Sequence, residues 1–122
     1  MNTKSLEGRA AIVTGGANGL GREIALRLAE EGVDVGIMSL SEEQVRLRPG
    51  ELKYFPPIAE INETQQEIEA TGVRCIALDG DVTDVIDLEK MVNSAMARFG
   101  RLDILVNNAA TNCVHPVLEH ND

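Results

Sequence analysis

The amino-acid sequence predicts an α/β fold built on one parallel sheet. Two hydrophobic patterns alternate along its 122 residues: short apolar runs, typical of buried strands, and apolar stripes at helical spacing. Strands that alternate with helices favour parallel pairing through right-handed crossovers. The length is that of a single domain, so we expect residues 1–122 to share one fold unit.

The first half of the chain carries two strands and one helix. Residues 10–14, Ala-Ala-Ile-Val-Thr, form an apolar run that ends in glycines and predict the first strand. Residues 20–31 carry apolar side chains at positions 20, 24, 25 and 28, one helical stripe, and Gly32 stands where a C-terminal cap is expected. Residues 33–38 predict the second strand. Residues 41–57, which contain three of the four prolines, are expected to be irregular.

The second half repeats the alternation. Isoleucines at 58, 61 and 68 predict a helix that stops at Gly72. Residues 74–79 predict the third strand. An apolar stripe over residues 88–99 predicts another helix, with acidic side chains at positions 84, 87 and 89 that suit the positive end of its dipole. Residues 102–106 predict the fourth strand.

Charge and cysteine content limit the function classes. With 11 basic and 20 acidic residues the net charge is −9, which argues against nucleic acids and anionic membranes as partners, because both require a basic surface. No run approaches the roughly 20 apolar residues of a membrane span. Cys75 and Cys113 are isolated, which favours a reducing compartment over a disulfide framework. With no signal-peptide pattern at residues 1–9, we expect a cytoplasmic protein.

The strongest motif is a glycine-rich segment, residues 14–21, between the first predicted strand and the first predicted helix. Its sequence is Thr-Gly-Gly-Ala-Asn-Gly-Leu-Gly. Glycines at such a turn let the chain reverse sharply and bring backbone amides close to a pyrophosphate at the helix N-terminus. A glycine cluster is also compatible with an ordinary flexible turn. Its position inside a strand–helix–strand unit favours dinucleotide binding.

Three segments resemble the short-chain dehydrogenase/reductase family. Residues 14–21 resemble its cofactor fingerprint, and Asp81-Val82, after the third predicted strand, resembles its adenine-contacting Asp-Val pair. Residues 99–109, Phe-Gly-Arg-Leu-Asp-Ile-Leu-Val-Asn-Asn-Ala, resemble the segment that runs into its Asn-Asn-Ala-Gly motif. The motifs occur in the family's order and span nearly the whole chain.

The resemblance implies the first half of a Rossmann-type doubly wound sheet, with strand order 3-2-1-4. It implies NAD or NADP as cofactor, and hydride transfer between a nicotinamide and an alcohol or carbonyl substrate. Phosphate, ribose and adenine contacts are then expected from the residues that match the family's cofactor site. These are Gly15, Asn18, Gly19, Leu20, Gly21, Ser39, Asp81, Val82, Asn107 and Ala109.

The chain departs from the family pattern at the end of the second strand. Ser39 occupies the position where NAD-binding folds usually carry an acid for the ribose 2′-hydroxyl, and this favours NADP. Asp34 lies at the other end of that strand and is interpreted as a solvated residue. Arg22, Arg46 and Arg48 are candidate partners for the extra phosphate, or else solvated charges.

Three further departures concern the rest of the site. Ala110 replaces the final glycine of the Asn-Asn-Ala-Gly motif, and the 41–57 segment is longer than usual. The family's catalytic Tyr-x-x-x-Lys pair has no counterpart, because the single tyrosine, Tyr54, is followed four residues later by Ile58. We therefore expect a cofactor-binding part that ends before the catalytic half and is inactive by itself. A non-catalytic dinucleotide-binding module and an inactive remnant are the alternatives.

The expected topology also predicts how the molecule is layered. The two helices that link the first three strands should share one face of the sheet, and the third helix should cover the other. The fourth strand would be an apolar edge, which favours association. In the complete enzyme the resemblance implies a small-molecule substrate and a homo-oligomer. No metal site is expected.

Overall fold

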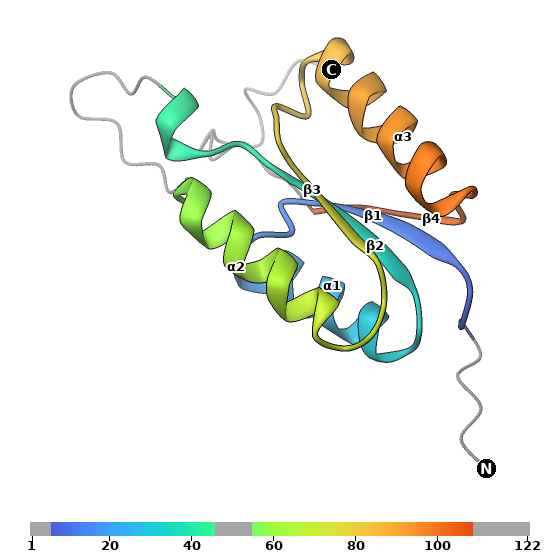
Figure 1. Ribbon diagram of the computed structural model, residues 1–122. Coiled ribbons are helices and arrows are strands. Elements are labelled where there is room, and N and C mark those ends of the chain that lie inside the picture. Colours follow the sequence, from blue (N-terminus) through green and yellow to red (C-terminus); the bar gives the residue numbers. More distant parts are fainter. Residues whose placement is uncertain (1–5, 46–54, 109–122) are drawn as a thin grey trace, which may run out of the picture.

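The computed structural model describes residues 6–45 and 55–108, which form a parallel sheet between two helical layers (Figure 1). The strand order is β3-β2-β1-β4, and every neighbouring pair is parallel. The predicted fold class and strand order are thus confirmed. The elements are β1 (Ala10–Thr14), α1 (Gly19–Glu30), β2 (Asp34–Ser39), the 3₁₀ turn η1 (Glu42–Gln44), α2 (Ile58–Glu69), β3 (Cys75–Asp79), α3 (Val85–Phe99) and β4 (Ile104–Asn107).

The helices cover the two faces of the sheet as expected. α1 and α2 pack on one face, and α3 packs alone on the other (Figure 1). Alternation along β1 explains the two cores, because successive strand side chains point to opposite faces. Val13 belongs to the core under α1 and α2, which also includes Ala25, Val35, Ile37 and Ile68. Ile12 belongs to the core under α3, with Met38, Met91, Ala95 and Phe99.

Element boundaries differ from the prediction by up to three residues. α3 begins at Val85 because the carboxylate of Asp84 accepts a hydrogen bond from the Ile86 backbone N–H at 2.9 Å and caps the helix. β4 begins at Ile104, two residues later than predicted. The segment expected to be irregular contains η1, and its residues 46–54 lie outside the described part.

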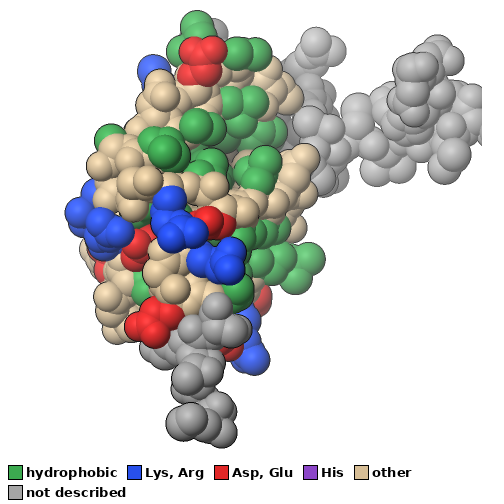
Figure 2. Space-filling view, turned by 90° about the vertical axis from the view of Figure 1, so that its right-hand side faces the viewer, with side chains coloured by type: hydrophobic (Ala, Val, Ile, Leu, Met, Phe, Trp, Pro, Cys, Tyr) green, Lys and Arg blue, Asp and Glu red, His purple; other side chains and the backbone are tan. Residues whose placement is uncertain are grey.

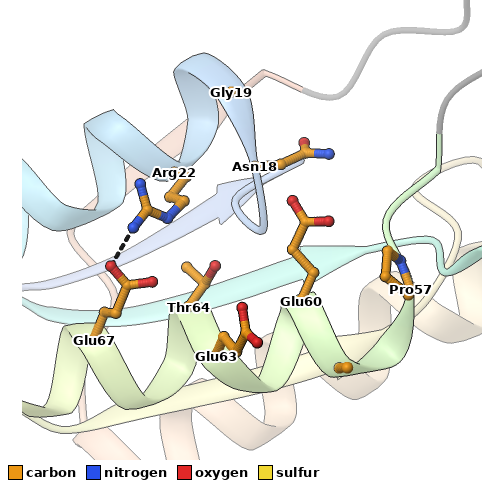
Figure 3. Close-up of a pocket in the computed structure, with 9 residues that line it drawn as sticks. Asn18, Gly19, Arg22, Pro57, Glu60, Glu63, Thr64 and Glu67 are labelled. Carbon is orange, nitrogen blue, oxygen red and sulfur yellow. Dashed lines mark hydrogen bonds and ion pairs between the residues drawn. The ribbon is translucent and has the colours of Figure 1, made fainter.

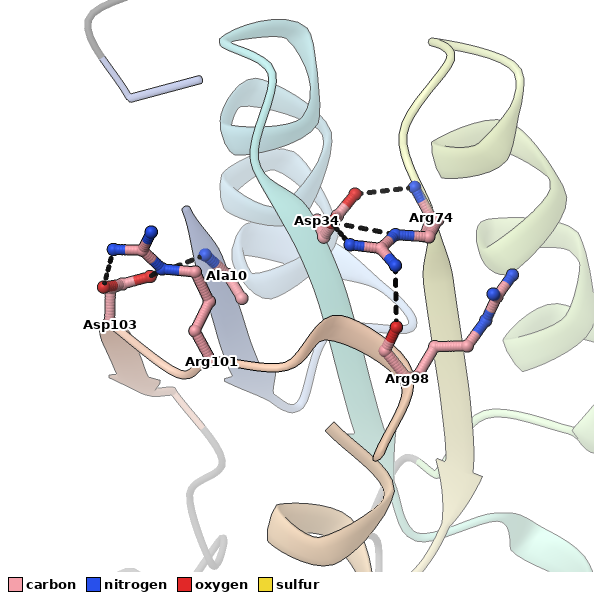
Figure 4. A network of polar contacts seen from close by, with 6 residues as sticks. All are labelled: Ala10, Asp34, Arg74, Arg98, Arg101 and Asp103. Carbon is pink, nitrogen blue, oxygen red and sulfur yellow. Dashed lines mark hydrogen bonds and ion pairs between the residues drawn. The ribbon is translucent and has the colours of Figure 1, made fainter. Parts of the chain in front are cut away.

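The interpretation of Asp34 as a solvated residue is wrong. Its carboxylate accepts hydrogen bonds from the backbone N–H of Arg74 at 2.8 Å and from the guanidinium Nη2 at 2.7 Å (Figure 4). The same guanidinium donates to the backbone carbonyl of Arg98 at 2.8 Å. This network fastens the start of β2 to the start of β3 and to the end of α3.

A second polar contact fastens β4 to β1 at the same end of the sheet. The Asp103 carboxylate accepts a hydrogen bond from the Ala10 N–H at 2.9 Å and pairs with the Arg101 guanidinium at 2.7 Å (Figure 4). The hydrogen bond from Arg101, followed by that from the Ala10 backbone, lowers the pKa of Asp103 to about 2. Figure 2, which views the molecule from the right-hand side of Figure 1, shows basic side chains with acidic ones among them.

Candidate functional site

The predicted site residues that the structure describes lie at the end of the sheet where the carboxyl ends of the parallel strands meet. In such folds ligands bind at this end of the sheet. Four of the strand ends contribute: the loop after β1, Ser39 at the end of β2, Asp81 and Val82 just after β3, and Asn107 at the end of β4. Ala109 and Ala110 lie outside the described residues.

The glycine-rich loop is shaped by glycines at two critical positions. Gly15 has a φ of +67°, a left-handed conformation that glycine adopts without a Cβ clash, and its N–H donates to the Met38 carbonyl at 2.7 Å. Gly21 faces the loop so closely that a Cβ there would stand 2.0 Å from the Gly15 carbonyl oxygen and 2.6 Å from the Asn108 side chain. Any side chain at position 21 would therefore displace the loop.

The N-terminus of α1 lies at this end of the sheet. Its first-turn amides have no intrahelical acceptor, and no acidic residue lies in the first turn. Within the described residues, the side chain of the N-cap residue Asn18 makes no hydrogen bond to the helix, so it does not cap these donors. The arrangement combines unpaired amides with the positive end of a helix dipole, which is the physical basis of phosphate binding at helix N-termini.

The middle of the loop is held from two sides. The Ala17 N–H donates to the Ser39 hydroxyl at 3.1 Å, and the Thr64 hydroxyl donates to the Ala17 carbonyl at 2.7 Å. All three residues are buried. Ser39, predicted as a cofactor contact, thus already serves the loop. Thr64 was missed because a threonine in a helical stripe gives no sign of the backbone group it will meet.

β1 and β4 are joined at the site through Thr14. Its hydroxyl lies 3.3 Å from both the Val106 carbonyl and the Asn107 side-chain oxygen, and it accepts from the Asn108 N–H at 3.0 Å. The Asn108 side chain donates to the Gly15 carbonyl at 3.4 Å. Asn108 therefore links β4 to the glycine-rich loop, a role that the sequence reading did not assign.

Two acids, one at the end of β3 and one just after it, accept hydrogen bonds from neighbouring groups. Asp79 accepts hydrogen bonds from the Ser41 N–H at 2.8 Å and the Ser41 hydroxyl at 2.5 Å, fixing the chain where it leaves β2. Asp81 accepts from the backbone N–H of Thr83 at 2.9 Å and from its hydroxyl at 2.7 Å. On this side of the site, the carboxylate is thus that of Asp79 on β3. Asp79 pairs with Ser39, the β2 residue that stands where the family usually has an acid.

An open groove of about 480 Å³ runs between the start of α1 and α2 (Figure 3). Asn18 and Arg22 line one wall, and the glutamates of α2 line the other. Arg22 is ion-paired with Glu67, and its guanidinium lies 3.5 Å from the Glu23 carboxylate. The positive charge of this candidate phosphate partner is therefore already balanced by two carboxylates. The other two candidates, Arg46 and Arg48, lie outside the described residues.

Metal and thiol chemistry have little basis in the described part. Within residues 6–45 and 55–108, no group of three or more His, Cys, Asp or Glu side chains could hold a metal ion. Burial, with a smaller contribution from Glu69, raises the pKa of the Cys75 thiol to about 12. No helix of the described chain is long and apolar enough to cross a membrane.

Comparison with known proteins places the chain in a family. The sequence matches the family described as short chain dehydrogenase over residues 9–54 and 57–122. It is 39% identical to the uncharacterized oxidoreductase YhxC of Bacillus subtilis (strain 168) over 116 residues, 95% of this chain and 35% of that protein. The chain spans about a third of the length of its first curated relatives.

Solved structures agree. A short chain dehydrogenase from Mycobacterium paratuberculosis, bound to NAD, superposes with a TM-score of 0.77 at 36% identity, over 85% of this chain and 37% of that one. A blue fluorescent protein from a metagenomic library, in complex with NADPH, does so with a TM-score of 0.74 at 31% identity, over 95% and 42% of the two chains. With the glycine-rich loop, the strand order and the sequence match in agreement, the chain belongs to the short-chain dehydrogenase family.

Proposed function

We propose that the glycine-rich loop and the start of α1 bind the pyrophosphate of NAD or NADP. The observation that carries this proposal is the close approach of Gly21 to Gly15 beside the uncapped N-terminus of α1. Together they bring the backbone N–H groups of the loop and of the first turn of α1 close to one place, where phosphate oxygens could accept from them. The residues present therefore fit a dinucleotide.

The predicted contacts are distributed along the carboxyl ends of the strands. Gly15, Asn18, Gly19, Leu20 and Gly21 would serve the phosphates and their riboses. Asp81 and Val82 would contact the adenine, and Asn107 the ribose region on the nicotinamide side. Ala109, outside the described residues, is proposed as a contact from the family motif alone. Thr14 and Asn108 would keep the loop in place at the β4 side.

For the complete protein we propose an oxidoreductase that acts on a small alcohol or carbonyl compound. When bound, the nicotinamide would supply a hydride acceptor or donor. The residues of this chain would bind and orient the cofactor, whereas the proton-transfer residues would come from sequence beyond it, because no Tyr-x-x-x-Lys pair is present here. We also propose that the complete protein is cytoplasmic and homo-oligomeric.

A second candidate, a dinucleotide-binding module or remnant without turnover, is favoured only if the protein ends at Asp122. Reading the coding sequence past the Asp122 codon separates the two. An open frame that encodes a serine and a Tyr-x-x-x-Lys pair supports the oxidoreductase. A stop codon at that point overturns it and leaves the binding module.

The cofactor preference proposed from the sequence is NADP, because Ser39 stands at the end of β2, where a carboxylate would repel a 2′-phosphate. Fluorescence titration with NADH and NADPH tests both binding and preference. Tighter binding of NADPH supports the proposal. Tighter binding of NADH overturns it, and substitution of Asp79, whose carboxylate fixes Ser41 beside the end of β2, then tests whether this acid replaces the missing one. No saturable binding of either cofactor overturns the proposed function itself.

A further inference from the structure

We infer that Ser39 and Thr64 are positioning residues, which hold the glycine-rich loop in its binding shape through the two polar groups of Ala17. This inference rests on the proposed dinucleotide binding at that loop. Cofactor affinity would then depend on α2 as well, because Thr64 belongs to this helix, which lines the groove of Figure 3.

The contact joins three distant parts of the chain at one residue. Ala17 has no exposed surface, so its N–H and C=O need partners inside the protein. Ser39, 22 residues away at the end of β2, accepts from the N–H at 3.1 Å. Thr64, 47 residues away on α2, donates to the C=O at 2.7 Å. Both bonds are formed by side chains that are almost fully buried.

The position of Thr64 on its helix argues for a role beyond packing. The buried face of α2 consists of Ile61, Thr64 and Ile68, so a hydroxyl occupies the middle of an apolar stripe. A valine would fill the same space and would gain more free energy from burial. A polar group at such a position is explained by the bond that it makes, and here that bond goes to the loop.

The loop itself explains why such a contact matters for binding. Three of the five residues from Gly15 to Gly19 are glycines, which restrict the backbone least and lose the most freedom when ordered. Fixing Ala17 from both sides orders the loop before a ligand arrives. Preorganisation of this kind raises affinity because less conformational entropy is lost on binding.

Substitution of the two hydroxyl groups in the complete protein tests the inference. Thr64→Val keeps the side-chain volume but removes the donor, and Thr64→Ser restores a hydroxyl. Ser39→Ala removes the acceptor. Ile68→Val is the matched control, because it trims a buried residue of the same helix face that makes no bond to the loop. For each variant, the dissociation constant of the preferred cofactor, the melting temperature and the hydrogen exchange of the Ala17 amide in the ligand-free protein are measured.

We expect Thr64→Val and Ser39→Ala each to weaken cofactor binding about tenfold, the fold-change that corresponds to one lost buried hydrogen bond. Thr64→Ser should return to within about twofold of the wild type, and Ile68→Val should bind as the wild type does even where its melting temperature falls. Ala17 amide exchange should accelerate in Ser39→Ala. Wild-type affinity in Thr64→Val and Ser39→Ala, or a loss equal to that of Ile68→Val, overturns the inference. A wild-type protein that binds no dinucleotide instead overturns the proposed function, and the exchange data then still report whether Ser39 orders the loop.

Discussion

At the scale of single residues, the site depends on what is missing at position 21. The backbone of Gly15 occupies the space in which any other residue would carry its Cβ, and the Asn108 side chain closes the same space from β4. Gly21 therefore does more than permit a turn. It lets the first turn of α1 and the end of β1 approach each other, which gives the site its shape.

Gly21→Ala tests this contact. Because the added methyl would stand 2.0 Å from a backbone oxygen, we expect the loop to shift, with a stability loss of about 1–3 kcal/mol and cofactor binding weakened by more than about tenfold. Gly100→Ala is the control, since the left-handed φ of +78° at Gly100 makes an alanine there costly in stability too, but Gly100 lies at the end of α3, away from the loop. Urea denaturation and cofactor titration of both variants give the comparison. Wild-type affinity in Gly21→Ala would contradict the close-approach role.

Cys75 provides a second prediction at this scale. Because burial raises the pKa of its thiol to about 12, almost no thiolate exists near pH 8 in the folded protein. In a Cys113→Ser variant, where Cys75 is the only cysteine, we expect no reaction with a disulfide reagent until urea unfolds the chain. Rapid labelling of the native protein would show that β3 opens locally at this position.

At the scale of elements, periodicity was enough to predict the strands and the helices, and the strand order implied by the family resemblance then predicted the faces that the helices cover. It could not predict contacts between side chains and backbone groups that lie far apart in the sequence. Asp34 meets Arg74 across 40 residues, and Thr64 meets Ala17 across 47. Such pairs depend on strand register and on the rotation of α2, which the pattern of apolar residues leaves undetermined. For the same reason Ser39 could be placed at the site, but its bond to the loop could not be foreseen.

The junction between β1 and β4 makes an element-scale prediction about pH. Asp103 has a folded-state pKa of about 2, below the ordinary 3.8, so the proton binds more readily to the unfolded chain. The stabilisation is complete above the ordinary pKa and is lost as pH falls towards 2. We expect the free energy of unfolding to fall more steeply over this range in the wild type than in Asp103→Asn, as measured by urea denaturation at several pH values. Parallel slopes would show that the Arg101 and Ala10 contacts do not form in solution.

At the scale of the whole molecule, the described part leaves apolar surface on the side of α3. Ile104 and Val106 pack with the core under α1 and α2, so Leu105 points to the opposite face, where it is 67% exposed. Several apolar side chains of α3 are also exposed, namely Val85, Ile86, Val92 and Met96. In the upper part of Figure 2, which corresponds to the level of α3 in Figure 1, hydrophobic side chains lie close together. β4 pairs only with β1 within the described sheet, so an open strand edge lies beside this surface.

An open edge next to an apolar surface favours association between copies. We therefore expect the 122-residue segment, prepared by itself, to associate as its concentration rises in sedimentation velocity experiments. Leu105→Lys should shift it towards the monomer, because a charged side chain on an edge strand disfavours pairing with another chain. Ala70→Lys adds the same charge at an exposed position after α2, on the other side of the sheet, and should leave association unchanged. A wild-type segment that remains monomeric with a sharp cooperative melt would show that the edge and the α3 surface are stable in water without a partner.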